Sequence, residues 1–186
     1  MTQYQIPNRQ SIRLPNYDYS QQGLYFITAC TQNREYLFGD IAASTMVLNE
    51  FGKTVDSVWQ SLPNRFPIKL DAFQIMPNHV HLIINIVGAI HESPDLIPAN
   101  QDGAHRDAPL QRSLLSQCIG YFKMNSTKLI HQIDPQVKIW QRNFYEHIVR
   151  NDQELFKIRE YIENNPQTWG KDRNNLEFQL KEPTED

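Results

Sequence analysis

The stretch IKLDAFQIMPNHVHLIINIV, residues 68–87, decides the expected fold. Its two halves, residues 68–76 and 79–87, are rich in branched aliphatic side chains, a composition typical of buried strands. Pro77 and Asn78 form a short break between them. Two strands joined by so short a connection are expected to pair in an antiparallel, hairpin-like arrangement.

Two histidines lie two positions apart at the start of the second strand. Alternate side chains of a strand point to the same face, so we expect His79 and His81 to emerge together while Val80 and Leu82 turn toward the core. Two neutral imidazoles side by side suit a divalent metal ion. Taken alone, the pair has a second interpretation, in which one histidine is buried and the other is exposed by chance.

The rest of the chain supplies the other elements of an α+β protein. Aromatic and β-branched runs predict strands, the helical spacing of apolar residues predicts helices, and Pro63 and Pro166 end two of the helices. The further expected elements are a strand at 23–31, helices at 49–62 and 110–133, a strand at 137–149 and a helix at 151–165.

The resulting order predicts a ferredoxin-like fold. The first six elements follow the split βαββαβ pattern, which gives an antiparallel sheet with helices on one face, and the last helix is an addition. We expect a single domain over residues 1–186, with a core of about 10–172. A long loop insertion is expected at 88–109. The chain is expected to be loose from Trp169 onward, and residues 173–186 form a polar tail.

Composition fits a cytoplasmic, globular protein. Hydrophobic residues make up 40% of the 186 residues, yet no apolar run approaches the length of a membrane span. The N-terminal region is polar and lacks the apolar core of a signal peptide. Cys30 and Cys118, each inside an apolar stretch, are expected to be reduced core residues and not a disulfide.

The net charge of −3 argues weakly against nucleic-acid binding, but the charge is unevenly distributed. Residues 109–159 hold eight basic and four acidic side chains, and a local net of +4 would suit a face that binds phosphates. An ordinary solvated face would explain the same count. The expected phosphate contacts are Lys123, Lys128, Arg142 and Arg150.

The last predicted helix carries a second pair of polar residues. Tyr161 and Asn165 lie four positions apart, which stacks them on one face of the helix, one turn from each other. In the simplest interpretation they are a half-buried tyrosine, whose hydroxyl reaches water, and an asparagine near the helix end.

Four segments together resemble a known family. They are GLYFITACTQNREYLFG at 23–39, MPNHVHLII at 76–84, WQRNFYEHIVRN at 140–151 and YIENNP at 161–166. In this order they are similar to the REP-associated tyrosine transposases, which belong to the single-tyrosine HUH transposases, named for a histidine, a hydrophobic residue and a histidine. The resemblance covers about residues 10–172.

The resemblance implies a metal-dependent transposase and nuclease that acts on single-stranded, hairpin DNA such as a REP element. It implies that His79 and His81 bind a divalent metal, Mg²⁺ or Mn²⁺, with Asn165 completing the site, and that Tyr161 is the nucleophile. Attack by a tyrosine would form a 5′-phosphotyrosine and release a 3′-hydroxyl, so that strands are cut and rejoined without an external energy source.

Several alternatives remain at this level. Tyr121 is either a residue at the edge of the core or a side chain that contacts DNA, and His147 is either structural or a support for the site in its second shell. The whole protein could instead be a non-catalytic nucleic-acid-binding module, or a metal-dependent phosphodiesterase that uses activated water. A monomer and a homodimer are both compatible with the sequence.

Overall fold

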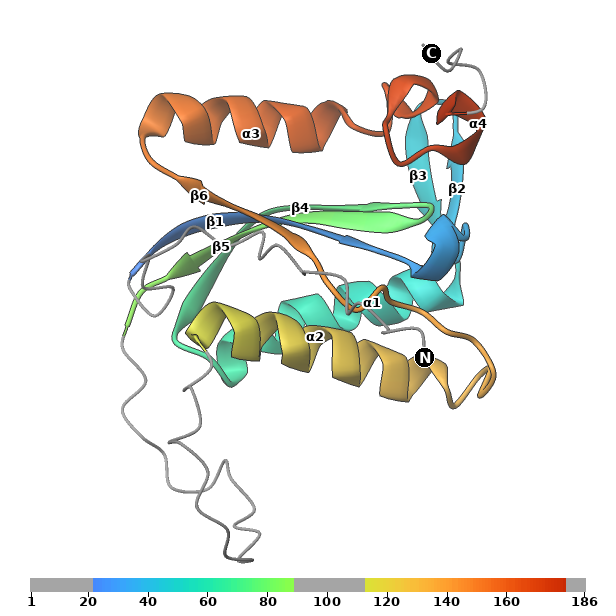
Figure 1. The fold of residues 1–186 in the computed structure, drawn as a ribbon, viewed down its shortest axis with the longest axis horizontal. Helices are drawn as coiled ribbons and strands as arrows, with labels where there is room; N and C mark the ends of the chain where they lie inside the picture. Colours follow the sequence, from blue (N-terminus) through green and yellow to red (C-terminus); the bar gives the residue numbers. More distant parts are fainter. Residues whose placement is uncertain (1–21, 89–112, 180–186) are drawn as a thin grey trace, which may run out of the picture.

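A four-stranded antiparallel sheet forms the centre of the protein (Figure 1). The computed structural model describes residues 22–88 and 113–179, so nearly all of the loop expected at 88–109 lies outside the described residues. The order of strands across the sheet is β4-β5-β1-β6. These strands are β1 (Gly23–Cys30), β4 (Ile68–Met76), β5 (His79–Ile86) and β6 (Tyr145–Val149).

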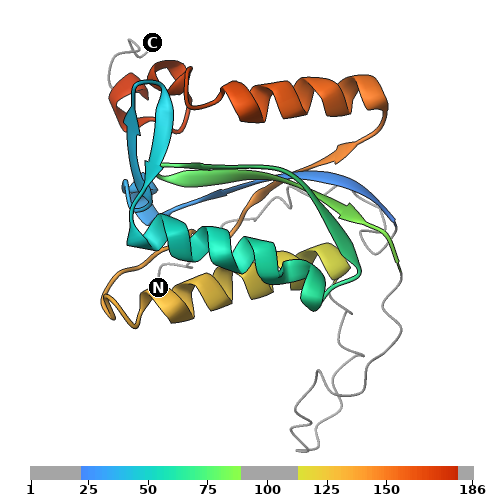
Figure 2. The same ribbon diagram turned by 180° about the vertical axis from the view of Figure 1, so that it is seen from behind.

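Helices cover both faces of the sheet (Figures 1 and 2). One face is covered by α1 (Glu50–Ser61) and α2 (Leu114–Ile130), and the other by α3 (Asp152–Asn164). The first six elements of the predicted order therefore form the expected ferredoxin-like α+β fold, and the additional helix α3 makes a third layer. Within the described ranges, no helix is long and apolar enough to cross a membrane.

Asparagine side chains fix where two of these helices begin. The Asn49 side chain accepts a hydrogen bond from the Gly52 backbone N–H at 3.0 Å, and Asn151 accepts one from the Glu154 N–H at 2.9 Å. Each satisfies a backbone donor that the first turn of a helix leaves without a partner. The second cap matters for function because it sets the register of the helix that carries Tyr161.

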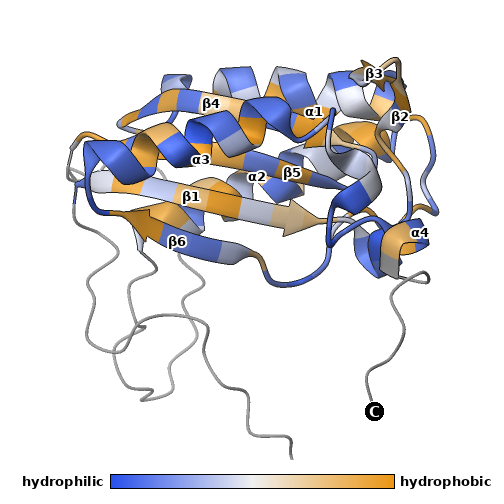
Figure 3. Ribbon diagram, turned by 90° about the horizontal axis from the view of Figure 1, so that it is seen from above, coloured by the Kyte–Doolittle hydropathy of each residue, from blue (hydrophilic) through white to orange (hydrophobic). Residues whose placement is uncertain are grey.

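The two faces of the sheet carry apolar clusters of very different size. The α1/α2 face buries a large cluster that includes Val80 and Leu82 of β5, whereas the cluster on the α3 face contains four buried apolar residues within the described part of the chain. The four are Ile83, Val149, Leu155 and Ile162. Seen from above in Figure 3, α3 carries hydrophilic and hydrophobic residues in alternation, as a helix with one packed stripe does.

The structure contains a hairpin that the sequence did not predict. Strands β2 (Gly39–Ala42) and β3 (Thr45–Leu48) pair with each other in a separate two-stranded sheet. They are joined by Ala43 and Ser44, whose φ angles of 47° and 61° are left-handed. Such a turn usually contains asparagine or glycine, so this one lacks the sequence signal by which tight hairpins are found.

Two expectations about the C-terminal half were wrong. The strand expected at 137–149 is restricted to β6, because residues 141–143 turn their carbonyls toward the Lys123 side chain. Residues 169–179 are ordered and not loose, since Trp169–Lys171 forms a 3₁₀ turn and Leu176–Gln179 forms the short helix α4. The rest of the expected tail, 180–186, lies outside the described residues. Both cysteines are free, but only Cys118 is a core residue, because Cys30 is partly buried and lines a cavity.

Candidate active site

His79 is held in one orientation by the asparagine that precedes it. The Asn78 amide nitrogen donates to the backbone carbonyls of Arg34 at 3.0 Å and Asn174 at 2.7 Å, which fixes the amide oxygen on the opposite side. That oxygen lies 2.8 Å from His79 Nδ1. A carbonyl oxygen can only accept, so Nδ1 carries the proton and Nε2 presents a bare lone pair.

His81 is oriented in the same way by the neighbouring strand. Its Nδ1 lies 2.9 Å from the hydroxyl of Thr28, its cross-strand partner in β1. The hydroxyl can accept the Nδ1 proton, which leaves Nε2 bare. The Nε2 atoms of His79 and His81 are 3.0 Å apart and both side chains are buried. Two nitrogens with converging lone pairs form a place for a cation.

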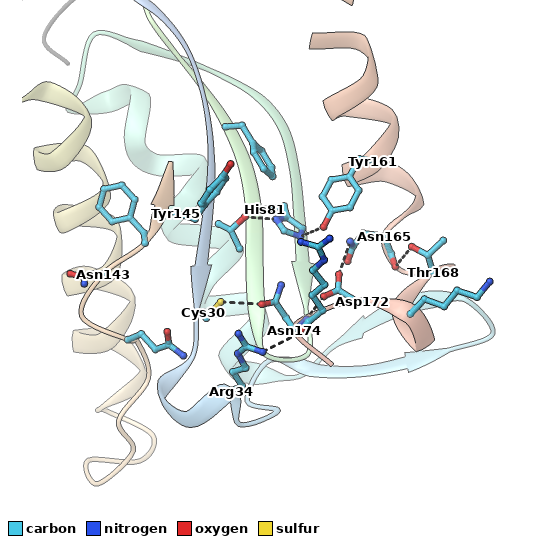
Figure 4. Close-up of a pocket in the computed structure, with 16 residues that line it drawn as sticks. Cys30, Arg34, His81, Asn143, Tyr145, Tyr161, Asn165, Thr168, Asp172 and Asn174 are labelled. Carbon is cyan, nitrogen blue, oxygen red and sulfur yellow. Dashed lines mark hydrogen bonds between the residues drawn. The ribbon is translucent and has the colours of Figure 1, made fainter. Parts of the chain in front are cut away.

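Helix α3 brings a tyrosine to the same point from the opposite side. The Tyr161 hydroxyl lies 3.2 Å from His81 Nε2, although the two residues are 80 positions apart in the chain. Figure 4 shows the ring pointing from α3 toward His81. The packing of Leu155 and Ile162 against Ile83 places this side of the helix over the sheet.

An aspartate from the C-terminal segment completes the cluster. Asp172 is buried, and its Oδ2 lies 3.9 Å from His79 Nε2. The carboxylate is held by the Asn165 amide nitrogen, which donates to Oδ2 at 2.9 Å, and by the Asn174 backbone N–H, which donates to Oδ1 at 2.6 Å. The ligand atoms of His79, His81 and Asp172 all lie within 4.8 Å of one another.

Burial keeps both imidazoles neutral. It lowers the pKa of His79 to about 3, with a further contribution from the nearby positive charge of Arg34. The pKa of His81 is also held well below its usual value, first by burial and then by its proximity to His79. Burial, followed by the negative charge of Asp172, raises the pKa of Tyr161 to about 12. The cluster therefore offers two neutral nitrogens and one carboxylate, next to a protonated phenol.

The chemistry of these donors fits a divalent metal ion. Imidazole nitrogens and a carboxylate oxygen are common ligands of such ions, and each histidine has a hydrogen-bond partner on its outer nitrogen. One further atom is available: Asn165 Oδ1 is buried and has no hydrogen-bond partner within residues 22–88 and 113–179. A buried oxygen without a partner is costly unless something else binds it, and a cation nearby would do so.

The structure places the other predicted site residues away from this cluster. Lys123 is occupied within the protein, because its ammonium donates to the backbone carbonyls of Gln141, Arg142 and Asn143. Tyr121 packs on the α1/α2 face, where its ring lies edge-on to Phe66. Exposed basic side chains remain at Lys128, Arg142 and Arg150, and their role in phosphate binding stays a prediction.

His147, predicted as a possible support for the site, makes a different contact. Its Nε2 lies 2.7 Å from a carboxylate oxygen of Glu154, near the start of α3. The same carboxylate accepts the Arg150 backbone N–H at 2.7 Å. The pair thus ties β6 to the first turn of α3. It acts on the placement of the helix and does not touch His79 or His81 directly in the described part of the chain.

Sequence reasoning missed Asp172, Asn78 and Arg34. Asp172 lies beyond the helix in a polar segment with no periodic pattern, and Asn78 looks like an ordinary turn residue. Arg34 has a left-handed backbone, with φ 57°, and its guanidinium donates to the Arg173 carbonyl at 3.0 Å. Its charge was not counted in the basic window at 109–159. Only the folded chain brings these three residues together.

The fold and the site together place the protein in a class: ferredoxin-like proteins with a candidate metal centre on one face of the sheet. Two buried histidines, a carboxylate and a tyrosine form this centre. Comparison with known proteins narrows this class, although no family model matches the chain. A Haemophilus influenzae protein of uncharacterised function is 40% identical over 173 residues, which span 90% of this chain and 93% of that protein. Another from the same organism, named "Putative REP-associated tyrosine transposase", is 30% identical over 156 residues, which span 80% of this chain and 73% of that protein.

The chain therefore belongs to the REP-associated tyrosine transposases. A solved structure of a REP-associated tyrosine transposase bound to a REP hairpin has the same fold, with a TM-score of 0.55 and 20% identity. The match covers 91% of this chain and 75% of that one. These relationships support a transposase-like role in DNA processing.

Proposed function

We propose that this protein cuts and rejoins single-stranded DNA through a covalent bond to Tyr161, with a divalent metal ion held at His79 and His81. The observation that supports the proposal is a short chain of contacts: 3.2 Å from the Tyr161 hydroxyl to His81 Nε2, and 3.0 Å from there to His79 Nε2. A nucleophile and a cation site thus share one pocket.

The proposed reaction exchanges one phosphate ester for another. The Tyr161 oxygen attacks the phosphorus, the bond from phosphorus to the 3′-oxygen breaks, and the tyrosine becomes a 5′-phosphotyrosine. The phenol proton leaves, and the departing 3′-oxygen takes up a proton to become a hydroxyl. The ester energy is kept in the new bond, so a 3′-hydroxyl of another strand can reverse the step and join to the phosphate.

A bound metal ion would neutralise phosphate charge and orient the phosphate for in-line attack. The protein's own contribution is placement. Thr28 and Asn78 hold the imidazoles, α3 holds the phenol, and the raised pKa of Tyr161 keeps it protonated until substrate arrives.

Asp172 is proposed as the third ligand, with Asn165 beside it. The Asn165 amide nitrogen donates a hydrogen bond to Asp172, so this amide positions the carboxylate. The atom of Asn165 that could bind the ion is its Oδ1. The mixture of imidazole and carboxylate donors suits Mg²⁺ or Mn²⁺, with water and phosphate oxygens filling the remaining positions.

We further propose that the substrate is hairpin DNA of the REP type and that Tyr161 acts within its own chain. A related structure holds a REP hairpin, and exposed Lys128, Arg142 and Arg150 could contact the backbone of such a hairpin. The contact between the Tyr161 hydroxyl and His81 of the same chain supports action within one subunit.

The direct experiment is to incubate labelled single-stranded hairpin DNA with Mg²⁺ or Mn²⁺ and to look for a protein–DNA adduct that resists denaturant. Wild type should form it, Tyr161→Phe should not, and Tyr121→Phe, a matched change on the other face of the sheet, should behave as wild type. Cleavage without an adduct would instead indicate a phosphodiesterase that uses water. Binding without cleavage would indicate a non-catalytic module.

Metal binding can be measured separately by titrating Mn²⁺ and following the signal of the unbound ion by electron paramagnetic resonance. Asp172→Asn should weaken binding by about tenfold or more, since an anionic ligand is lost. Glu177→Gln, which removes an exposed carboxylate five residues further on, should leave binding unchanged. Equal affinity in wild type and Asp172→Asn would remove Asp172 from the ligand set.

A further inference from the structure

The site described above occupies only one end of a larger cavity. The cavity has a volume of about 760 Å³, and Phe26 and Phe144 are among the residues that line it. Figure 4 shows Tyr161 and Asp172 on one side of it and Tyr145 on the other. The first end holds the proposed metal ligands His81 and Asp172. The second end is aromatic, and neither the metal nor the tyrosine chemistry uses it.

Tyr145 is the most exposed aromatic side chain of this second end. Its side chain is 49% exposed, and its ring meets Phe26 edge-on at 6.3 Å between centroids. Phe26 in turn meets the ring of Tyr161 edge-on at 6.2 Å. The partly buried ring of Phe26 therefore lies between the proposed nucleophile and an open aromatic surface. A planar group stacked on Tyr145 would be held one ring away from the point of attack.

Two amide side chains border this aromatic surface. Gln141 and Asn143 line the same cavity, and their side-chain amides make no hydrogen bond within the described ranges. An amide offers one acceptor and two donors, the pattern that base edges match. The aromatic end has no carboxylate among its cavity-lining residues in the described chain, so nothing there repels a nucleotide.

The backbone that carries these amides is fixed in place. The Lys123 ammonium donates to the carbonyl of Gln141, to that of Arg142 at 3.1 Å and to that of Asn143 at 3.3 Å. The segment leads directly into β6, where Tyr145 pairs with Thr28 of β1. Thr28 also bonds His81, so the aromatic end and the metal end are attached to the same residue of the sheet.

We propose that this aromatic end binds one unpaired base of the DNA, next to the phosphate that Tyr161 attacks. The base stacks on Tyr145, and Asn143, with Gln141, bonds its edge. An unpaired base is the occupant that fits, because stacking on an exposed aromatic ring is a principal source of affinity for single strands. The inference rests on the proposed function, since it places the base relative to the Tyr161 attack.

The experiment combines a change in the protein with a change in the DNA. The probe is the hairpin oligonucleotide of the adduct assay, carrying either 2-aminopurine or an abasic site at each position beside the scissile phosphate. Binding is measured in EDTA, where no cleavage competes. For wild type, one position should show quenched 2-aminopurine emission and lose about tenfold in affinity when the base is absent, because a stacked base contributes about 1–3 kcal/mol.

Tyr145→Ala should lose both the quenching and the abasic penalty, whereas Tyr145→Phe should retain both. Phe156→Ala is the matched control, because Phe156 is 67% exposed on α3 and does not line the cavity. Asn143→Ala provides an independent variant. It should reduce the difference in affinity between DNAs that carry different bases at this position. An abasic penalty that persists in Tyr145→Ala, or DNA binding with no quenching at either flanking position, would overturn the proposal.

The result is separable from that of the adduct assay. If wild type quenches 2-aminopurine but never forms an adduct, the base pocket stands and the proposed cleavage chemistry fails. If adducts form at Tyr161 while Tyr145→Ala leaves the abasic penalty intact, the chemistry stands and the pocket is wrong.

Discussion

The two faces of the central sheet are built for different purposes. On the face covered by α1 and α2, β5 presents Val80 and Leu82, which have no exposed surface and belong to a large apolar cluster. On the face covered by α3, the same strand presents His79 and His81. Successive residues of one strand therefore belong in turn to the apolar core and to the candidate site, because the strand's side chains alternate between faces.

The α3 face gives up stability to hold polar groups together. Burying two imidazoles and a carboxylate costs free energy that Thr28, Asn78 and Asn165 only partly offset by hydrogen bonding. Its apolar contacts are few, so α3 is attached less firmly than α1 and α2. We therefore expect substitutions on the α3 face to reduce mainly activity, and substitutions on the α1/α2 face to reduce mainly stability.

The largest effect is expected for His81→Ala. We expect the rate of adduct formation to fall by about 10²- to 10³-fold, because a proposed metal ligand worth several kcal/mol in the proposed reaction is lost. The free energy of unfolding in EDTA should fall much less in His81→Ala than in Leu82→Ala, the same truncation at the neighbouring residue. Adduct formation and urea denaturation measured on the same samples will show this. A variant that folds and retains the wild-type rate would contradict the site.

Leu82→Ala is the matched change on the opposite face. The residue is fully buried, and truncating a buried leucine costs about 2–5 kcal/mol through lost burial and a remaining cavity. Urea denaturation should show that loss. The variant should still bind Mn²⁺ and form adducts under conditions where it is folded, since its side chain points away from the site. A selective loss of chemistry without loss of stability would break the proposed division between faces.

Stability of the metal-free protein should depend on pH through the histidines. The pKa of His79 is about 3 in the folded protein, whereas a histidine in the unfolded chain takes up its proton near 6.5. Between these values the unfolded state binds more protons, so the free energy of unfolding falls as pH falls from 6.5 toward 3. The slope from one histidine is at most about 1.4 kcal/mol per pH unit. Urea titrations in EDTA should show a shallower slope in His79→Asn; an unchanged slope would contradict the buried neutral imidazole.

The smallest effect is expected at the ion pair that fastens α3 to β4. Arg159 contacts Asp71 through two bonds, Nε to Oδ1 at 2.8 Å and Nη2 to Oδ2 at 2.5 Å, and holds the pKa of that carboxyl below its usual value. The pair is partly exposed, so its coupling free energy should be about 1 kcal/mol or less. A double-mutant cycle with Arg159→Met and Asp71→Asn measures it, and a coupling of several kcal/mol would show that α3 depends on this pair more than on its apolar contacts.

Much of the fold could be predicted because its signals are local. The branched aliphatic composition of 68–87 and the apolar spacing of the helices identify β4, β5, α1 and α2, and their order gives the ferredoxin-like topology. The hairpin β2–β3 was missed because its turn, Ala43 and Ser44, has none of the usual turn residues. The strand at 137–149 was predicted too long because the Lys123 contact that bends it comes from a distant helix.

The candidate site was predictable only in part. His79 and His81 follow from strand periodicity, whereas their proximity to Tyr161 was expected only from the family resemblance. Asp172 could not be predicted, since its place beside His79 depends on how the C-terminal segment folds back over the sheet end. That segment is attached by contacts between side chains and backbone, such as Asn78 to Asn174, which leave no periodic signal in the sequence.

The proposed function requires that a cation and the Tyr161 phenol share one pocket on the α3 face. Anomalous diffraction from crystals soaked in Mn²⁺ tests this most directly. We expect a single strong peak within bonding distance of the Nε2 atoms of His79 and His81 and of the Asp172 carboxylate, with the Tyr161 hydroxyl beside it. No peak at saturating Mn²⁺, or a peak beyond the reach of that hydroxyl, would contradict it.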